Sequence, residues 1–179
     1  MKGIVFTEFI DMVESKFGYG MMDEIIETSN LPSGGVYTAV GTYDHSEMVK
    51  LVVELSNRTQ IPINELLKSY GKHLLGVFTS GYPQFFENTN DAFSFFEQID
   101  QYIHVEVQKL YPDAELPKFD TNRIDDSTLE MIYTSQRKMS DLAEGLIEAT
   151  IEFFKENSTV VREDLNPNGT IVKFTITRV

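Results

Sequence analysis

His104 is the residue whose type and position most favour chemistry, because its imidazole borders the apolar face of a predicted helix. The segment 91–111 carries apolar residues at helical spacing, namely Phe93, Phe96, Ile103, Val107 and Leu110. Short polar residues at 88–91 suit the N-terminal cap, and Pro112 ends the helix because proline lacks a backbone donor. A lone histidine here is usually a packed core residue, so its role depends on the groups that accompany it.

A second group of polar side chains is predicted further along the chain. Tyr133, Ser135 and Arg137 alternate at the end of a predicted strand, where every second residue shares a face. A phenol, a hydroxyl and a planar guanidinium together donate hydrogen bonds suited to carboxylates or phosphates. On the pattern alone, the commoner interpretation is a sheet rim with a solvated arginine.

The elements that position His104 are predicted to be helical. Helices are expected over 6–17, 21–28, 44–56 and from Pro62 to about residue 80. Asp44 and Glu47 resemble a capping box at the third of these. The segment 36–43 suits either a short strand or an extended connection. Gly71 and Gly76 lie inside the fourth helix, which favours a close approach of another element.

After Pro112 the hydrophobic period changes from helical spacing to two. Strands are predicted over 118–123, 128–135, 159–165 and 170–178, with a helix over 140–156 between the two hairpins. The fold is therefore predicted to be α+β, with a helical part followed by a small four-stranded antiparallel sheet with one inserted helix. We expect one domain over 1–179, divided into a helical subregion of about 1–112 and a sheet-containing subregion of about 113–179.

Composition excludes several classes of protein. The formal net charge is −13, from 15 basic and 28 acidic side chains, which disfavours nucleic acid and anionic membranes as partners. The chain has no cysteine, which excludes disulfides, thiolate metal sites, iron–sulfur clusters and covalent c-type haem. Acidic residues come too early for a signal-peptide core, and no apolar run is long enough to span a membrane. We expect a cytoplasmic protein.

A histidine on a buried edge, a carboxylate clamp and an aromatic, aliphatic set of helices together fit a non-covalently held b-type haem. A carrier of an apolar carboxylate such as a fatty acid would use the same clamp and pocket, but would leave His104 without a role. An enzyme is disfavoured, because neither His45 nor His73 is accompanied by a nucleophile, a phosphate loop or metal-ligand spacing.

Several short segments carry a resemblance to a known family: Met1–Ile4, Ile103–Val107, Leu110–Pro112, Leu116–Pro117, Tyr133-x-Ser135-x-Arg137 and Leu142–Ile147. With them, the chain resembles bacterial haem nitric oxide/oxygen binding (H-NOX) domains, a family that includes the haem domain of soluble guanylate cyclase. The segments are spread over nearly the whole chain. The tyrosine–serine–arginine motif is specific to the family when combined with the upstream histidine.

The resemblance implies a haem b (iron protoporphyrin IX) between the helical and sheet-containing parts. It implies His104 as the proximal iron ligand and Tyr133, Ser135 and Arg137 as the partners of the propionates. Pro117 is implied to press on the macrocycle and distort it. The remaining pocket lining is implied to come from Val5, Phe9, Leu74, Leu142 and Leu146. For these residues an ordinary core position is the alternative, and both interpretations predict burial.

Leu142 carries the implied gas selectivity. Family members that bind oxygen stably have a tyrosine five residues after the motif arginine, and here that position is Leu142. Phe9 and Leu74 offer no hydrogen-bond donor either. The resemblance therefore implies that NO and CO bind and that O₂ is rejected, with a haem-based O₂ sensor as the alternative. Relatives with a zinc site built from cysteine and histidine differ from this chain, which has no cysteine.

The resemblance further implies a sensor and not an enzyme. NO binding is implied to weaken the bond between iron and His104 and to release the helix that carries it. A separate signalling protein would respond, either a histidine kinase or a cyclic-di-GMP synthase/phosphodiesterase. The ligand must interact differently with the two states, because otherwise no switching follows.

Overall fold

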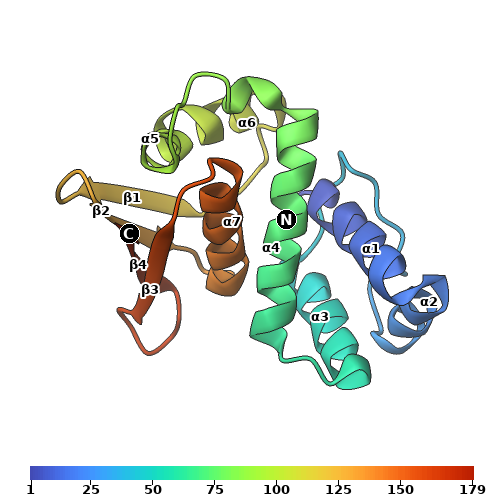
Figure 1. Ribbon diagram of the computed structural model, residues 1–179. Helices are drawn as coiled ribbons and strands as arrows, with labels where there is room; N and C mark the ends of the chain where they lie inside the picture. Colours follow the sequence, from blue (N-terminus) through green and yellow to red (C-terminus); the bar gives the residue numbers. More distant parts are fainter.

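Apolar residues at a spacing of three and four dominate the first part of the chain, and alternating residues dominate the last part. The computed structural model describes residues 1–179 and shows helices first and a sheet after residue 117 (Figure 1). The elements are α1 (Gly3–Phe17), α2 (Tyr19–Thr28), α3 (His45–Thr59), α4 (Ile63–Gly81), a 3-10 turn (Pro83–Phe85), α5 (Ala92–Gln98), a π-helical segment (Ile99–Ile103), α6 (His104–Leu110), β1 (Lys118–Arg123), β2 (Thr128–Thr134), α7 (Ser140–Phe153), β3 (Ser158–Asp164) and β4 (Ile171–Arg178). The predicted α+β fold is confirmed.

Helices α1 to α4 pack around one hydrophobic core. Each contributes side chains from one apolar face, which is removed from water as the helices meet. Completely buried examples are Phe6, Phe9, Val13, Ile25, Leu51, Leu55 and Tyr70.

A buried carboxylate on α3 holds the connection between α2 and α3. Glu47 is 3% exposed, and its carboxylate accepts hydrogen bonds from Ser33 Oγ at 2.5 Å and from the Tyr37 hydroxyl at 2.9 Å. Burial raises the pKa of Tyr37 to about 12. The capping box is therefore half formed: Asp44 accepts from the Ser46 N–H at 2.8 Å, while Glu47 turns to the loop.

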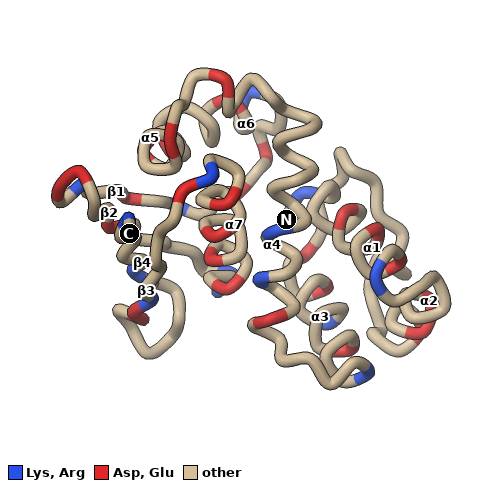
Figure 2. The backbone as a smooth tube through the Cα atoms, in the orientation of Figure 1, with Lys and Arg blue, Asp and Glu red and all other residues tan.

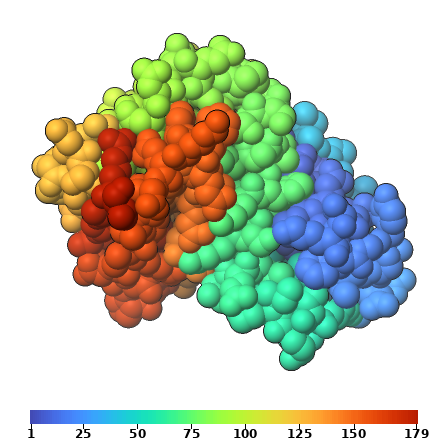
Figure 3. Space-filling model, in the orientation of Figure 1, coloured from blue at the N-terminus to red at the C-terminus, as the bar shows by residue number.

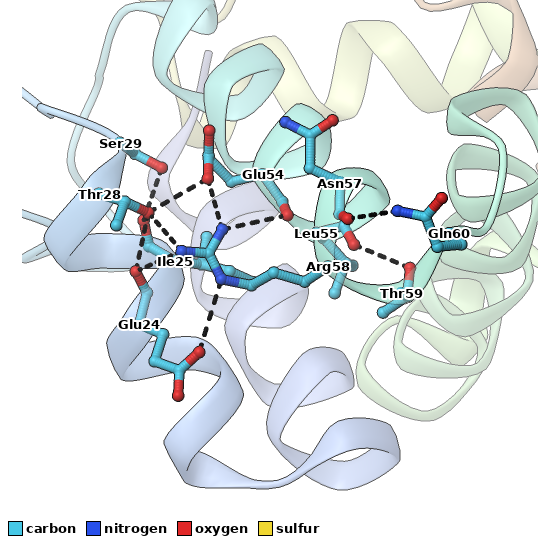
Figure 4. A network of polar contacts seen from close by, with 10 residues as sticks. All are labelled: Glu24, Ile25, Thr28, Ser29, Glu54, Leu55, Asn57, Arg58, Thr59 and Gln60. Carbon is cyan, nitrogen blue, oxygen red and sulfur yellow. Dashed lines mark hydrogen bonds and ion pairs between the residues drawn. The ribbon is translucent and has the colours of Figure 1, made fainter.

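Arg58 connects α2 with α3 (Figure 4). Its guanidinium pairs with Glu54 on its own helix and donates to the Thr28 hydroxyl at 2.9 Å on α2. Glu24 lies 3.6 Å from Arg58 Nε. Because these groups are exposed to solvent, water screens the pairs and each contributes little to stability.

The antiparallel sheet has the strand order β1-β2-β4-β3. In its register, Leu129 faces Ile176, Met131 faces Phe174 and Tyr133 faces Val172. All six side chains are at most 2% exposed, so one face of β2 and β4 is buried throughout. Residues of α5 and α7 pack on this face in the second hydrophobic core.

Helices α4 and α7 join the helical and sheet-containing parts, which meet along α4 in the space-filling view (Figure 3). Their backbones approach closely, because a Cβ on Gly71 would lie 2.5 Å from the Leu142 carbonyl oxygen, and one on Gly145 would overlap the Lys68 backbone. The close approach predicted at Gly71 is confirmed, whereas the space beside Gly76 is open.

Ion pairs line the same crossing. Figure 2 marks basic positions along α4 and acidic positions along α7, and these residues form ion pairs between the two helices. Lys68 pairs with Glu144, and Lys72 lies 3.4 Å from Glu148 and 2.9 Å from Glu152. These pairs reinforce the crossing where the absence of side chains on the two glycines lets the helices meet.

Two local predictions are refined by the structure. The segment 36–43, predicted as a short strand or an extended connection, forms no strand: it contains a turn at Ala39 and Val40, and only Thr42 makes an isolated bridge, to Lys2. The single helix predicted over 91–111 is instead α5, the π-helical segment and α6 in succession. None of the helices is long and apolar enough to cross a bilayer.

Candidate functional site

An apolar cavity of about 310 Å³ lies between the helical and sheet-containing parts, and 25 of its 32 lining residues are hydrophobic. Nine of the predicted site residues line it: His104, Tyr133, Ser135, Arg137, Pro117, Val5, Leu74, Leu142 and Leu146. Phe9 is buried but does not line the cavity. Its ring packs edge-on against Tyr70 at 5.2 Å between centroids, inside the core of the helical part.

His104 begins α6 and contributes its imidazole to the cavity wall. Its Nδ1 lies 2.7 Å from Oδ1 of Asp100. A carboxylate accepts hydrogen bonds, so Nδ1–H donates and Nε2 keeps its lone pair. Burial lowers the pKa of His104, against the opposing effect of the Asp100 carboxylate, which raises it. A neutral imidazole with a free Nε2 is the form that binds a metal ion.

The π-helical segment just before His104 supplies Asp100. The second carboxylate oxygen of Asp100, Oδ2, accepts a hydrogen bond from the Phe119 backbone N–H on β1 at 3.0 Å. π-helical turns are rare in proteins, and those that occur are often found at functional sites. The sequence interpretation missed Asp100, although its position four residues before His104 was a usable signal.

Tyr133, Ser135 and Arg137 lie at the polar end of the cavity. Strand β2 ends at Thr134, so the following turn, and not strand alternation alone, brings the three side chains together. The Tyr133 hydroxyl accepts from the Met139 N–H at 3.1 Å, and burial raises its pKa.

Arg137 is anchored by the loop before β1. Its guanidinium donates to the Glu115 carbonyl at 2.7 Å and to the Glu115 carboxylate at 2.9 Å. The backbone N–H of Arg137 donates to Ser135 Oγ at 3.2 Å. The Glu115 side chain is 86% exposed, so this carboxylate can leave Arg137 at little cost when another one enters.

A polar cavity adjoins this end and shares Met1, Lys2, Glu115 and Arg137 with the apolar one. Lys2 Nζ donates to Thr42 Oγ1 at 2.9 Å and to Asp113 at 3.1 Å. Neither Lys2 nor Glu115 was predicted from the sequence. The site therefore has an apolar body and one end that contains basic side chains.

The wall formed by α1, α4 and α7 offers no hydrogen-bond donor from Val5, Leu74, Leu142 or Leu146. The phenol closest in sequence to Leu74 belongs to Tyr70, which does not line the cavity and donates its hydroxyl to the Val5 carbonyl. These four side chains are apolar, whereas the hydroxyl-bearing residues Thr150 on α7 and Tyr82 after α4 line other parts of the cavity surface.

Neither of the other two histidines lines the apolar cavity, although His45 lines the adjoining polar one. His73 Nε2 is 3.3 Å from a Glu8 carboxylate oxygen, and His45 is half exposed beside Asp44. The chain contains no cluster of three or more histidines and carboxylates that could hold a metal ion.

The residues that line the cavity fit a non-covalently bound haem. His104 provides a free imidazole nitrogen, Arg137 with Tyr133 and Ser135 provides partners for carboxylates, and most of the remaining lining is apolar. A fatty-acid-like ligand would satisfy the last two features, but would leave the imidazole nitrogen without a partner.

Comparison with known proteins agrees with this geometry. The model of the haem–NO-binding family matches residues 2–162, and the chain belongs to this family. A comparison with curated protein sequences gave no match.

Solved structures of H-NOX proteins are similar over the full chain. The Fe(II) unliganded H-NOX protein from K. algicida is 44% identical, with a TM-score of 0.96 over 100% of this chain and 97% of that one. The H-NOX from Shewanella woodyi in the Fe(II)CO state, bound to IWP-051, is 42% identical, with a TM-score of 0.85 over 100% and 95%. The S. oneidensis H-NOX protein in the Fe(II)NO state is 26% identical, with a TM-score of 0.92 over 100% and 99%.

Proposed function

We propose that this protein is a haem-based nitric oxide sensor. One observation carries the proposal: His104, with a free Nε2, and the Tyr133–Ser135–Arg137 group line the same apolar cavity. Membership of the haem–NO-binding family and similarity to H-NOX structures in the Fe(II)NO and Fe(II)CO states support it.

Each residue has a specific task in this proposal. His104 is the protein ligand of the iron, and Arg137, with Tyr133 and Ser135, holds the propionates. Pro117 and the aliphatic side chains exclude water and hold the macrocycle. When bound, haem supplies an iron centre that takes NO or CO as ligands.

The apolar wall determines the proposed gas selectivity. Bound O₂ gains more from a hydrogen-bond donor than bound NO does, because the O₂ molecule carries more negative charge when it is bound to iron. Val5, Leu74 and Leu142 provide no such donor. We therefore expect NO and CO to be retained and O₂ to be rejected, so an O₂ sensor is the weaker alternative.

The helix that carries His104 is suited to movement. Four residues of α5 are buried, whereas α6 and the π-helical segment have none. Arg123 pairs with Glu97 on α5 at 2.8 Å, and Arg178 pairs with Asp91 at 2.9 Å, which fixes α5 on the sheet. Loss of the bond at His104 on NO binding would therefore release α6 and leave α5 in place.

The proposed output is regulation of a separate protein without catalysis by this domain. A histidine kinase or a cyclic-di-GMP synthase/phosphodiesterase in trans is the proposed partner class. The two states of α6 supply the differential surface that such regulation requires.

Absorption spectra test the proposed function. The protein is purified with haem available, reduced without oxygen, and exposed separately to NO, CO and air. We expect a Soret band that shifts with NO and with CO and no stable oxygenated form in air. A stable oxygenated form would make O₂ sensing the better function, and absence of bound haem would favour the carrier of an apolar carboxylate.

A further inference from the structure

Asp100 uses both carboxylate oxygens on groups beside the cavity. Oδ1 lies 2.7 Å from Nδ1 of His104, and Oδ2 accepts from the Phe119 backbone N–H at 3.0 Å. The side chain is 26% exposed, so these bonds are only partly screened by water. One carboxylate thus connects the imidazole to the edge strand β1.

Packing encloses the His104 side chain, which is 19% exposed, but supplies no polar partner that would orient its ring. Residues of α6 and the π-helical segment are at most partly buried, with Ile103 and Val107 packed against the core. The nearest aromatic ring, Phe119, lies 6.0 Å from the imidazole at a tilt of 43°. The bond to Asp100 is the only hydrogen bond of the imidazole, so it sets the direction in which Nε2 points.

The anchor of Asp100 is rigid, in contrast to the helix it holds. Phe119 is paired with Tyr133 in the register of β1 and β2. Tyr133 is itself 2% exposed and belongs to the polar end of the same cavity. Asp100 therefore connects the imidazole to β1, the strand whose residue Phe119 pairs with Tyr133 on β2.

We propose that Asp100 is the positioning residue for His104. Its carboxylate directs the Nε2 lone pair of His104 toward the cavity and makes Nε2 a stronger electron-pair donor. Its hydrogen bond with the Phe119 amide connects His104 to the sheet. This inference rests on the proposed function, because the donor strength of His104 matters only toward a metal. Carboxylates that orient a ligating histidine typically change metal affinity or activity by about 10- to 100-fold. Asp100 thereby sets how readily His104 is released.

Two substitutions separate the roles of the carboxylate. An amide has one acceptor oxygen, so Asp100→Asn can serve either His104 or the Phe119 N–H but not both, and it removes the charge. Asp100→Ala removes both bonds. Glu106→Gln is the matched control, because Glu106 lies two residues from His104 but bonds with Lys109 at 2.6 Å.

Resonance Raman spectra of the haem-loaded, ferrous protein measure the bond from iron to His104 directly. We expect its stretching frequency to fall in Asp100→Asn and further in Asp100→Ala, and to stay unchanged in Glu106→Gln. Under NO, the ratio of His104-bound to His104-released protein should fall by about 10- to 100-fold in Asp100→Ala.

The outcomes distinguish this inference from the proposed function. Haem-loaded wild type with unchanged frequency and unchanged release in both Asp100 variants would overturn the positioning role alone. Wild type that takes up no haem would overturn the proposed function and the positioning role together. A shift of the same size in Glu106→Gln would show a general charge effect and also overturn the role of Asp100.

Discussion

Leu142 is the position where one hydroxyl group is expected to change gas selectivity. Its side chain lies on the cavity wall with Val5 and Leu74, and none of the three donates a hydrogen bond. Leu142→Tyr adds a phenol to this wall. The cavity of about 310 Å³ provides room for the larger side chain before haem and ligand are bound.

The size of the effect follows from one buried hydrogen bond. A hydrogen bond to a charged group contributes about 1.5–3 kcal/mol. At about 1.4 kcal/mol for each tenfold change, this predicts O₂ dissociation slowed by about 10- to 150-fold. NO binding should change much less, because NO gains little from a donor.

Stopped-flow measurement of O₂ dissociation from the ferrous protein tests the prediction. Leu142→Phe is the control, because it adds the ring without the hydroxyl group. Equal O₂ retention in the Tyr and Phe variants would refute the reasoning, since ring size and not a hydrogen bond would then be responsible. Stable O₂ binding by the wild type would refute it as well.

Three further predictions follow from particular contacts. Arg137→Met should speed haem loss to an excess of apomyoglobin by about tenfold or more, because a charge-assisted partner of the propionates is removed; an unchanged rate would contradict the propionate role. Gly145→Ala should lower the free energy of unfolding by about 1–3 kcal/mol in denaturant titrations, because the new methyl group meets the Lys68 backbone. Gly76→Ala, in open space, should be neutral or stabilising, and equal losses in the two glycine variants would refute the close-packing argument. Hydrogen bonds from Ser94 and the Arg178 guanidinium lower the pKa of Asp91 in the folded state, although burial raises it. The stabilisation by Asp91 is therefore complete above a pH of about 4 and is lost as pH falls through the lowered pKa. Thermal unfolding below pH 4 should depend less on pH in Asp91→Asn than in wild type, and parallel curves would contradict this.

The sheet was predictable because its residues obey one local rule. Val172, Phe174 and Ile176 alternate without interruption, and the structure buries all three in the core between the sheet and the helices. Register and period agree wherever one face of a strand is buried, so strand bounds came within one residue. The helices of the first part were predictable because their apolar residues recur at spacings of three and four, which places them on one buried face.

The π-helical segment was not predictable from periodicity. An apolar stripe continues from Phe93 to Leu110, so the pattern predicts one helix. The π-helical turn carries Asp100, whose Oδ2 accepts a hydrogen bond from the Phe119 amide on β1. That contact joins two separate elements, and a helical pattern does not record it.

Phe9 is the one pocket residue implied by the family resemblance that does not line the cavity in the structure. Helix α1 turns Val5 to the cavity and Phe9 to Tyr70 in the helical core. Both residues are apolar and lie one helical turn apart, so the sequence does not distinguish the two environments. Lys2 and Glu115 were missed for the opposite reason, because single charged residues in surface segments give no pattern.

The most direct test of the central claim is the ferrous absorption spectrum of the haem-loaded His104→Ala protein, with His45→Ala as the control. His45 does not line the apolar cavity, although it lines the adjoining polar one, and its side chain is half exposed. We predict that the His104 variant loses the native ferrous spectrum while its far-UV circular dichroism is retained, and that added imidazole restores the spectrum. The His45 variant should match wild type. A native ferrous spectrum in the His104 variant would contradict the claim that His104 binds the iron.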